Sequence, residues 1–179
     1  MHLPNSFRQI SVTSMKPLTE QEIRSAFVNC TKGEAKRLSV PRDLADRPWD
    51  DLDFLGWRDP QAPDRAYLVT ARDDRPRALA LRSSNAASWQ TRRSMCSLCL
   101  TTHTGGVSLM VATRAGRRGQ RGDSVGVYIC SDLACSLYVR GKKDAGIGAR
   151  LQESLTVEEK IQRTVANLDA FLAKVTATA

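Results

Sequence analysis

The chain has 179 residues, 41% of them hydrophobic and 26% charged, which is the composition of one globular domain with or without a small appendage. No run of 18 apolar residues occurs and the N-terminus lacks the apolar stretch of a secretory signal, so we expect a cytoplasmic protein with reduced thiols and no membrane contact. The net charge of +8 is concentrated between residues 90 and 150, where ten basic and three acidic side chains give +7. This concentration favours an anionic partner such as RNA, a ribonucleoprotein, DNA or an acidic protein, although a solvated basic face is the alternative.

Residues 17–33 predict the first helix. Thr19 is followed three positions later by Glu22, which is the spacing of a capping box at a helix start. Cys30 lies on the apolar face of this helix, so we expect it in the core and not on a metal. The Lys-Gly pair at 32–33 would end the helix, and a second short helical piece could follow.

The next segment predicts an aromatic-rich loop and then a hairpin. Residues 43–64 are punctuated by proline, and their large aromatic side chains are expected to pin the loop to the core. Two apolar runs at 66–71 and 78–83 flank an Asp-Asp-Arg-Pro turn, which predicts a pair of antiparallel strands. The aromatic residues of the loop are Trp49, Phe54 and Trp57.

Four of the five cysteines have the spacing of a metal site. Cys96 and Cys99 form a Cys-x2-Cys pair, and Cys130 and Cys135 form a Cys-x4-Cys pair after 30 intervening residues. Two such pairs complete a closed four-thiolate cage, which predicts one structural Zn²⁺ with no open position for catalysis. A disulfide framework and a redox pair are the alternatives, and His103 is a candidate spare ligand.

The residues between the pairs predict the rest of a treble-clef zinc finger. Strands are expected at 107–113 and 124–130, and a short helix should carry Cys135 in its first turn. The Gly/Arg segment at 114–123 is expected to be an exposed basic loop, and it lacks the Gly-Lys-Ser/Thr ending of a phosphate-binding loop. Its arginines could contact phosphates: Arg114, Arg117, Arg118 and Arg121.

The C-terminal segment predicts a long amphipathic helix. Thr156 and Glu159 have the spacing of a second capping box, and an apolar stripe follows at Ile161, Val165, Leu168, Leu172 and Val175. We therefore divide the chain into a tail, an N-terminal helix-and-hairpin part, the finger, and a linker with the C-terminal helix: 1–14, 15–93, 94–140 and 141–179. Both Met1 and Met15 could start the natural chain.

A family resemblance is carried by the FLGW sequence at 54–57, by the hairpin that follows it, and then by the two cysteine pairs with the strands between them. In this order they resemble the C-terminal treble-clef finger of the FBP family, the elongation factor G-binding proteins that include the FusB-like fusidic acid resistance proteins. The similarity covers roughly residues 52–139. It implies an α+β fold, with a small antiparallel sheet flanked by helices and a treble-clef zinc finger. It also implies a protein that binds elongation factor G and promotes its release from stalled ribosomes without catalysing a reaction.

The resemblance also assigns residues. It makes the four cysteines the ligands of one structural Zn²⁺, and it places Tyr128 and Met95 at positions that contact the partner. Arg140 would then form part of a basic rim beside them. The chain departs from the resistance proteins in having Val125 at the position of a contact lysine, in a last cysteine pair that is one residue tighter, and in lacking their long N-terminal helical bundle.

No arrangement of residues predicts catalysis. Only two histidines occur, and every well-placed cysteine is assigned to metal, so no nucleophile and base pair stands out. We therefore expect a binding protein with no small-molecule substrate. Two hypotheses follow: a protein that binds elongation factor G or the ribosome and its rRNA and modulates translation, or a zinc finger that binds RNA or DNA.

Overall fold

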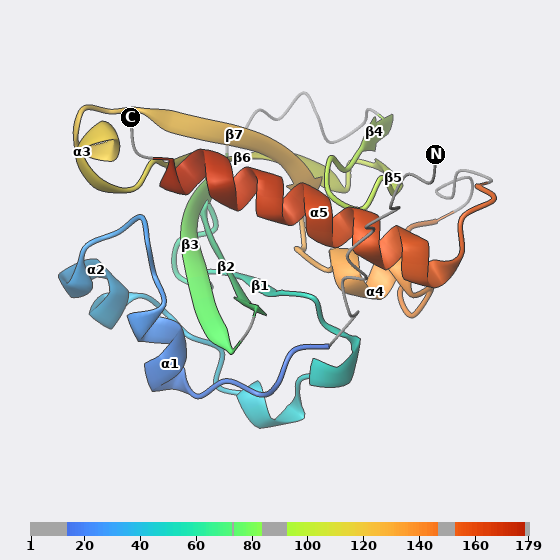
Figure 1. Ribbon diagram of the computed structural model, residues 1–179, viewed down its shortest axis with the longest axis horizontal. Helices are drawn as coiled ribbons and strands as arrows, with labels where there is room; N and C mark the ends of the chain where they lie inside the picture. Colours follow the sequence, from blue (N-terminus) through green and yellow to red (C-terminus); the bar gives the residue numbers. More distant parts are fainter. Residues whose placement is uncertain (1–13, 73, 84–92, 147–152, 178–179) are drawn as a thin grey trace, which may run out of the picture.

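The computed structural model describes residues 14–72, 74–83, 93–146 and 153–177, and it confirms the expected α+β fold (Figure 1). Its centre is a five-stranded antiparallel sheet in the order β1-β2-β3-β6-β7. The strands are β1 Leu55–Arg58, β2 Arg65–Arg72, β3 Arg75–Ser83, β6 Val107–Thr113 and β7 Ser124–Cys130. A separate two-stranded sheet pairs β4, Arg93–Met95, with β5, Thr102–Thr104. The proposed tail, apart from Ser14, lies outside the described residues.

Both predicted hairpins are present. β2 and β3 pair from Arg65 opposite Arg82 to Arg72 opposite Arg75, so each strand extends beyond the apolar run that predicted it. β6 and β7 occupy the predicted residues and pair from Val107 opposite Cys130 along their whole length. The register of the second hairpin matters most, because it places Cys130 at the end where the metal site forms.

The prediction of a single helix at 17–33 is wrong. The chain forms two short helices, α1 at Glu20–Ser25 and α2 at Lys32–Arg37, each of which begins with a capping box. The second box joins Thr31 to Glu34, so the Lys-Gly pair starts a helix instead of ending one. Between the helices Phe27 forms a parallel bridge with Ala78 of β3, and the chain then bends at residues 28–30.

The segment between α1 and α2 closes a gap in the sheet. β3 and β6 pair only where the end of β3 meets the middle of β6, Arg82 with Val111 and Ser83 with Met110, and then diverge. Asn29 lies in the gap: its amide oxygen accepts from Ala80 N, and its amide nitrogen donates to the carbonyls of Ala80 and Thr113. A side chain thus replaces the missing backbone ladder between the two strands.

The aromatic-rich segment at 43–64 packs against the core as expected, but it is not entirely a loop. It contains two 3-10 turns, Leu44–Asp46 and Trp49–Asp51, followed by the edge strand β1. Phe54 is 1% exposed, and the indole of Trp57 donates to Ser39 O at 2.7 Å. Burial alternates along β1, as is typical of a strand, and β1 pairs with β2 over its whole length.

One core connects the N-terminal part with the finger. Helix α5, Val157–Thr176, lies along β6 and β7 beside α4, Cys135–Val139, while α1 and α2 lie at the far side of β3 (Figure 1). The predicted stripe of α5 is buried, and its capping box is present. At Gly56 of β1 an added Cβ would lie 2.4 Å from Leu133 Cβ, so this glycine permits the close packing of the two parts. Within the described residues, no helix is long and apolar enough to cross a bilayer.

Candidate metal centre

The first cysteine pair lies in the turn between β4 and β5. Cys96 N donates to Thr101 O at 2.9 Å, which closes the turn. The backbone N–H groups of Leu98 and Cys99 both point at Cys96 Sγ, at 3.4 and 3.5 Å. Amides aimed at a sulfur favour its thiolate form, and this geometry is what a Cys-x2-Cys metal knuckle requires.

The second pair meets the first. Cys130 ends β7 and Cys135 begins α4, as the sequence predicted. The four sulfurs all lie within 4.8 Å of one another, with 3.7 Å between Cys96 and Cys135 and 3.5 Å between Cys99 and Cys130. A tetrahedral zinc with bonds of about 2.3 Å has sulfur–sulfur edges of about 3.8 Å, so the four residues are positioned to hold one ion.

The electrostatics of the cluster also favour a cation. Hydrogen bonds from the thiols of Cys130 and Cys135 lower the pKa of Cys96, whereas burial raises the pKa of Cys135. Four thiolates in one buried cluster repel one another, so without a cation some of the sulfurs keep their protons. A divalent cation removes this repulsion and allows all four to ionise. The chemistry of the donor set therefore fits one structural zinc.

His103, the candidate spare ligand of the sequence, lies beside the cluster. The residue is 5% exposed, its Nε2 lies 3.3 Å from Cys130 Sγ, and its ring packs edge-on against Tyr138. A Cβ at Gly106 would lie 2.7 Å from His103 Cβ, so the glycine allows this approach. The ring is placed to donate a hydrogen bond to a ligand sulfur, which is a supporting role for a metal site.

Two contacts fix the knuckle against the rest of the protein. Asn167 of α5 donates to Leu98 O at 2.9 Å, and Ser97 N donates to Tyr128 O at 2.7 Å. The fifth cysteine, Cys30, is a half-buried free thiol between α1 and α2 and is not part of the cluster. All five cysteines are free, so the disulfide alternative finds no support in the structure.

The knuckle, the β6–β7 hairpin and the helix that carries the last cysteine form a treble-clef arrangement. The profile of the family described as the FBP C-terminal treble-clef zinc-finger matches residues 22–175. The chain belongs to this FBP family. The match extends well beyond the finger, in agreement with the shared core, and it confirms the resemblance seen in the sequence.

Comparison with solved structures gives the same fold. The FBP chain is similar to the fusidic acid resistance protein FusC with a TM-score of 0.58 and 16% sequence identity. The alignment covers 92% of this chain and 61% of the FusC chain, so the FBP chain spans about three-fifths of FusC. No curated protein sequence matches the chain.

The structure places the two expected contact residues of the FBP domain at its surface. Met95 is 44% exposed and Tyr128 is 37% exposed, and each lies within two residues of a cluster cysteine. Tyr128 alternates with the buried Val127 and Ile129, so it is on the outward face of β7. The Ser97–Tyr128 bond ties the knuckle to β7 at this residue.

Arg140 is not part of an exposed rim. Its guanidinium makes a two-pronged ion pair with Asp53, at 2.6 and 3.0 Å, and the two side chains are only 10% and 3% exposed. Asp53 also receives a hydrogen bond from Thr70 at its carbonyl and donates its N–H to Ser136 Oγ. The pair therefore connects β2 and the preceding loop to α4, and nothing in the sequence pattern links residues 87 positions apart.

The Gly/Arg segment is also more ordered than expected. It contains a short helix, α3 at Gly116–Gln120, and it is attached to the end of α5 by bonds from Arg114 to Lys174 O and from Ala115 N to Val175 O. Gly119 is packed, since an added Cβ would lie 1.9 Å from Arg114 O. Arg118 pairs with Asp123 at 3.0 Å, which leaves Arg117 and Arg121 as the exposed arginines of this segment.

Proposed function

We propose that this FBP chain is a zinc-containing binding protein that binds elongation factor G through the outer face of its finger and so modulates translation. One observation carries the proposal. The described residues include three exposed large hydrophobic side chains, and two of them, Met95 and Tyr128, border the metal cluster. An exposed aromatic ring and a thioether on a rigid support are typical of the centre of a protein interface.

The family supports the choice of partner. FBP proteins were expected from the sequence to bind elongation factor G, and FusC is a fusidic acid resistance protein of similar fold. The thiol that lies beside a base, Cys130 next to His103, is one of the four residues of the metal cluster, so the proposal is a binding function. A pull-down of purified elongation factor G by the immobilised zinc-loaded chain at physiological salt tests it. Retention of the factor supports the proposal, and a clean flow-through rejects it.

Replacing Tyr128 by alanine is expected to weaken elongation factor G binding by at least about 2 kcal/mol, the usual effect of truncating an interface hot spot. The side chain is on the surface, so zinc content and the melting transition should be unchanged. A binding titration with folded variant protein measures the loss. Tyr128→Phe is the matched control, because it keeps the ring and should keep most of the affinity. Wild-type affinity in the alanine variant would remove Tyr128 from the interface.

A contact with the ribosome or its rRNA is the second part of the proposal. Arg117 and Arg121 are exposed on a segment that α5 holds in place, so they can meet phosphates without a large ordering cost.

Replacing Arg117 and Arg121 together by alanine is expected to weaken co-sedimentation with ribosomes and to flatten its dependence on salt, because fewer counterions are released. Zinc content should not change. Arg118→Ala is the control, since its guanidinium is already paired with Asp123. If the double variant sediments with wild-type affinity and salt dependence, the segment is only a solvated basic surface.

A further inference from the structure

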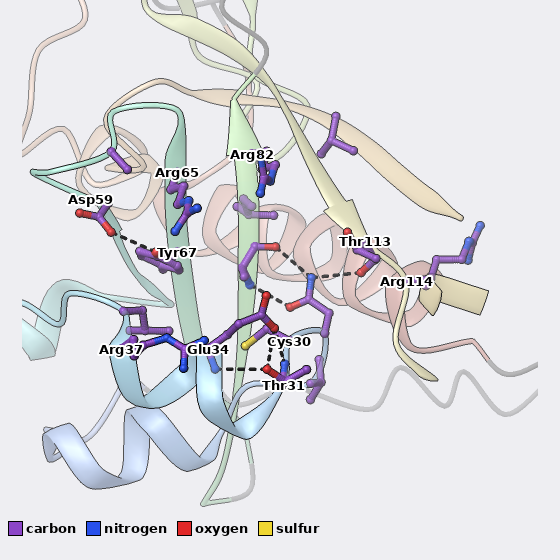
Figure 2. A pocket seen from close by; sticks show the side chains of 18 of the residues that line it. Cys30, Thr31, Glu34, Arg37, Asp59, Arg65, Tyr67, Arg82, Thr113 and Arg114 are labelled. Atoms are coloured by element: carbon purple, nitrogen blue, oxygen red, sulfur yellow. Dashed lines mark hydrogen bonds between the residues drawn. The ribbon is translucent and has the colours of Figure 1, made fainter. Parts of the chain in front are cut away.

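A large open pocket lies away from the zinc site, where β3 and β6 diverge (Figure 2). Its volume is about 890 Å³, and its walls are α2 on one side and the turn after β6 on the other. The floor is formed by β2 and β3, with Tyr67 bonded to Asp59 as drawn in Figure 2. No predicted site residue except Arg114 borders it.

Four arginines from four different elements line this pocket. Arg37 ends α2, Arg65 begins β2, Arg82 is near the end of β3, and Arg114 follows β6. Arg65 and Arg82 are directly opposite each other in the β2–β3 register, and Figure 2 shows them side by side. Like charges in directly opposed positions destabilise a sheet, and a bound anion would offset this repulsion.

The two acidic residues of the pocket offset its positive charge only in part. Hydrogen bonds from Thr31, and then the charges of Arg37 and Arg65, lower the pKa of Glu34. Glu34 uses its carboxylate to accept from Thr31 N and Oγ1, both at 2.8 Å. The carboxylate of Asp59 accepts from Gln61 N at 2.9 Å and from the Tyr67 hydroxyl at 3.1 Å. Within the described parts of the chain, no ion pair holds Arg37, Arg65 or Arg82. With four arginines against two acids, the pocket keeps an excess of positive charge.

The lining indicates the chemistry of the ligand. Arginine binds phosphate through two parallel N–H donors, and both Arg65 and Arg82 are exposed at this pocket. The aromatic ring in the lining, Tyr67, is 4% exposed, so the pocket offers no platform on which a base could stack. Beyond the pocket come Arg117 of α3 and Arg121 directly after it, and Gly116 and Gly119 of α3 border the pocket. A row of cations of this kind suits a chain of phosphates more than a compact anion.

We propose that this pocket binds the phosphate backbone of RNA, independently of base sequence. The site is separate from the finger face proposed for elongation factor G and does not depend on that function. It assigns a location and a ligand chemistry to the nucleic-acid contact proposed above, with Arg65 and Arg82 at its centre.

The test is a fluorescence-anisotropy titration of the zinc-loaded full chain with a labelled oligouridylate at several salt concentrations. The variant Arg65→Ala with Arg82→Ala is expected to bind at least about tenfold more weakly, with a salt slope smaller by about 1.4, since each contact to a single strand contributes about 0.7. Arg65→Lys with Arg82→Lys should recover part of the affinity, because the charges remain and the two-pronged geometry is lost.

The matched control is Arg75→Ala with Arg77→Ala, which removes the same charge from exposed positions on the opposite face of β3. An equal loss in this control would reduce the effect to net charge and overturn the proposal. Absence of RNA binding by the wild type would also overturn it. Competition by tripolyphosphate or by oligoglutamate as strong as that by unlabelled RNA would assign the pocket to a small phosphate or to an acidic peptide instead. Tyr128→Ala should bind RNA normally, so the two functions can fail separately.

Discussion

Replacing Cys130 by serine is expected to release the zinc ion and unfold the finger. Metal binding in small zinc modules is folding free energy, on the order of 10 kcal/mol or more, and the cluster has no spare sulfur to replace the lost ligand. Because β7 is part of the central sheet, the damage should reach beyond the knuckle. Metal analysis by atomic emission and circular dichroism of the purified variant measure the two effects.

Cys30→Ser is the matched control for this experiment. It removes a free thiol outside the cluster, so the variant should keep one zinc per chain and its fold. The ligand assignment fails if wild-type protein carries no stoichiometric zinc, or if the Cys30 variant loses it.

The second large effect is expected at the buried ion pair. Arg140→Ala leaves the Asp53 carboxylate, which is 3% exposed, without its cation, and breaking a buried pair in this way costs about 3–5 kcal/mol. Urea denaturation of the zinc-loaded protein measures the loss as a lower midpoint. The double variant that also replaces Asp53 should lose less unfolding free energy than the sum of the losses in the two single variants.

Lys142→Ala provides the comparison for the ion pair. Lys142 lies two residues further along and pairs with Asp51, but its side chain is 56% exposed, so its loss should cost less than about 1 kcal/mol. If both substitutions lowered the unfolding free energy by the same amount, burial would not make the Arg140 pair more stabilising than the exposed Lys142 pair.

The sequence predicted those features that depend on local spacing. The strands at 107–113 and 124–130, the capping boxes of α1 and α5, and the four-cysteine cluster are all present as expected. The register of a hairpin is set by its own two strands, and the spacing of the cysteines sets the four-thiolate cluster. Short-range sequence patterns were therefore sufficient to predict these features.

Features that depend on distant partners could not be predicted in this way. The apolar face at 17–33 indicated one helix, but Phe27 pairs with β3 and Asn29 closes the gap to β6, so tertiary bonds override the helical pattern. The residues next to Arg140 in the sequence predict an exposed side chain. Its ion pair with Asp53 forms only because the fold brings the two residues together. The arginine pocket is assembled from four elements and has no sequence signature.

The central claim is that the finger face binds elongation factor G, and calorimetric titration of the factor with the zinc-loaded wild-type chain tests it most directly. We predict a saturable heat of binding with one chain per factor, which Tyr128→Ala weakens and Arg65→Ala with Arg82→Ala leaves unchanged. A flat titration with folded, zinc-loaded wild-type protein would contradict the claim.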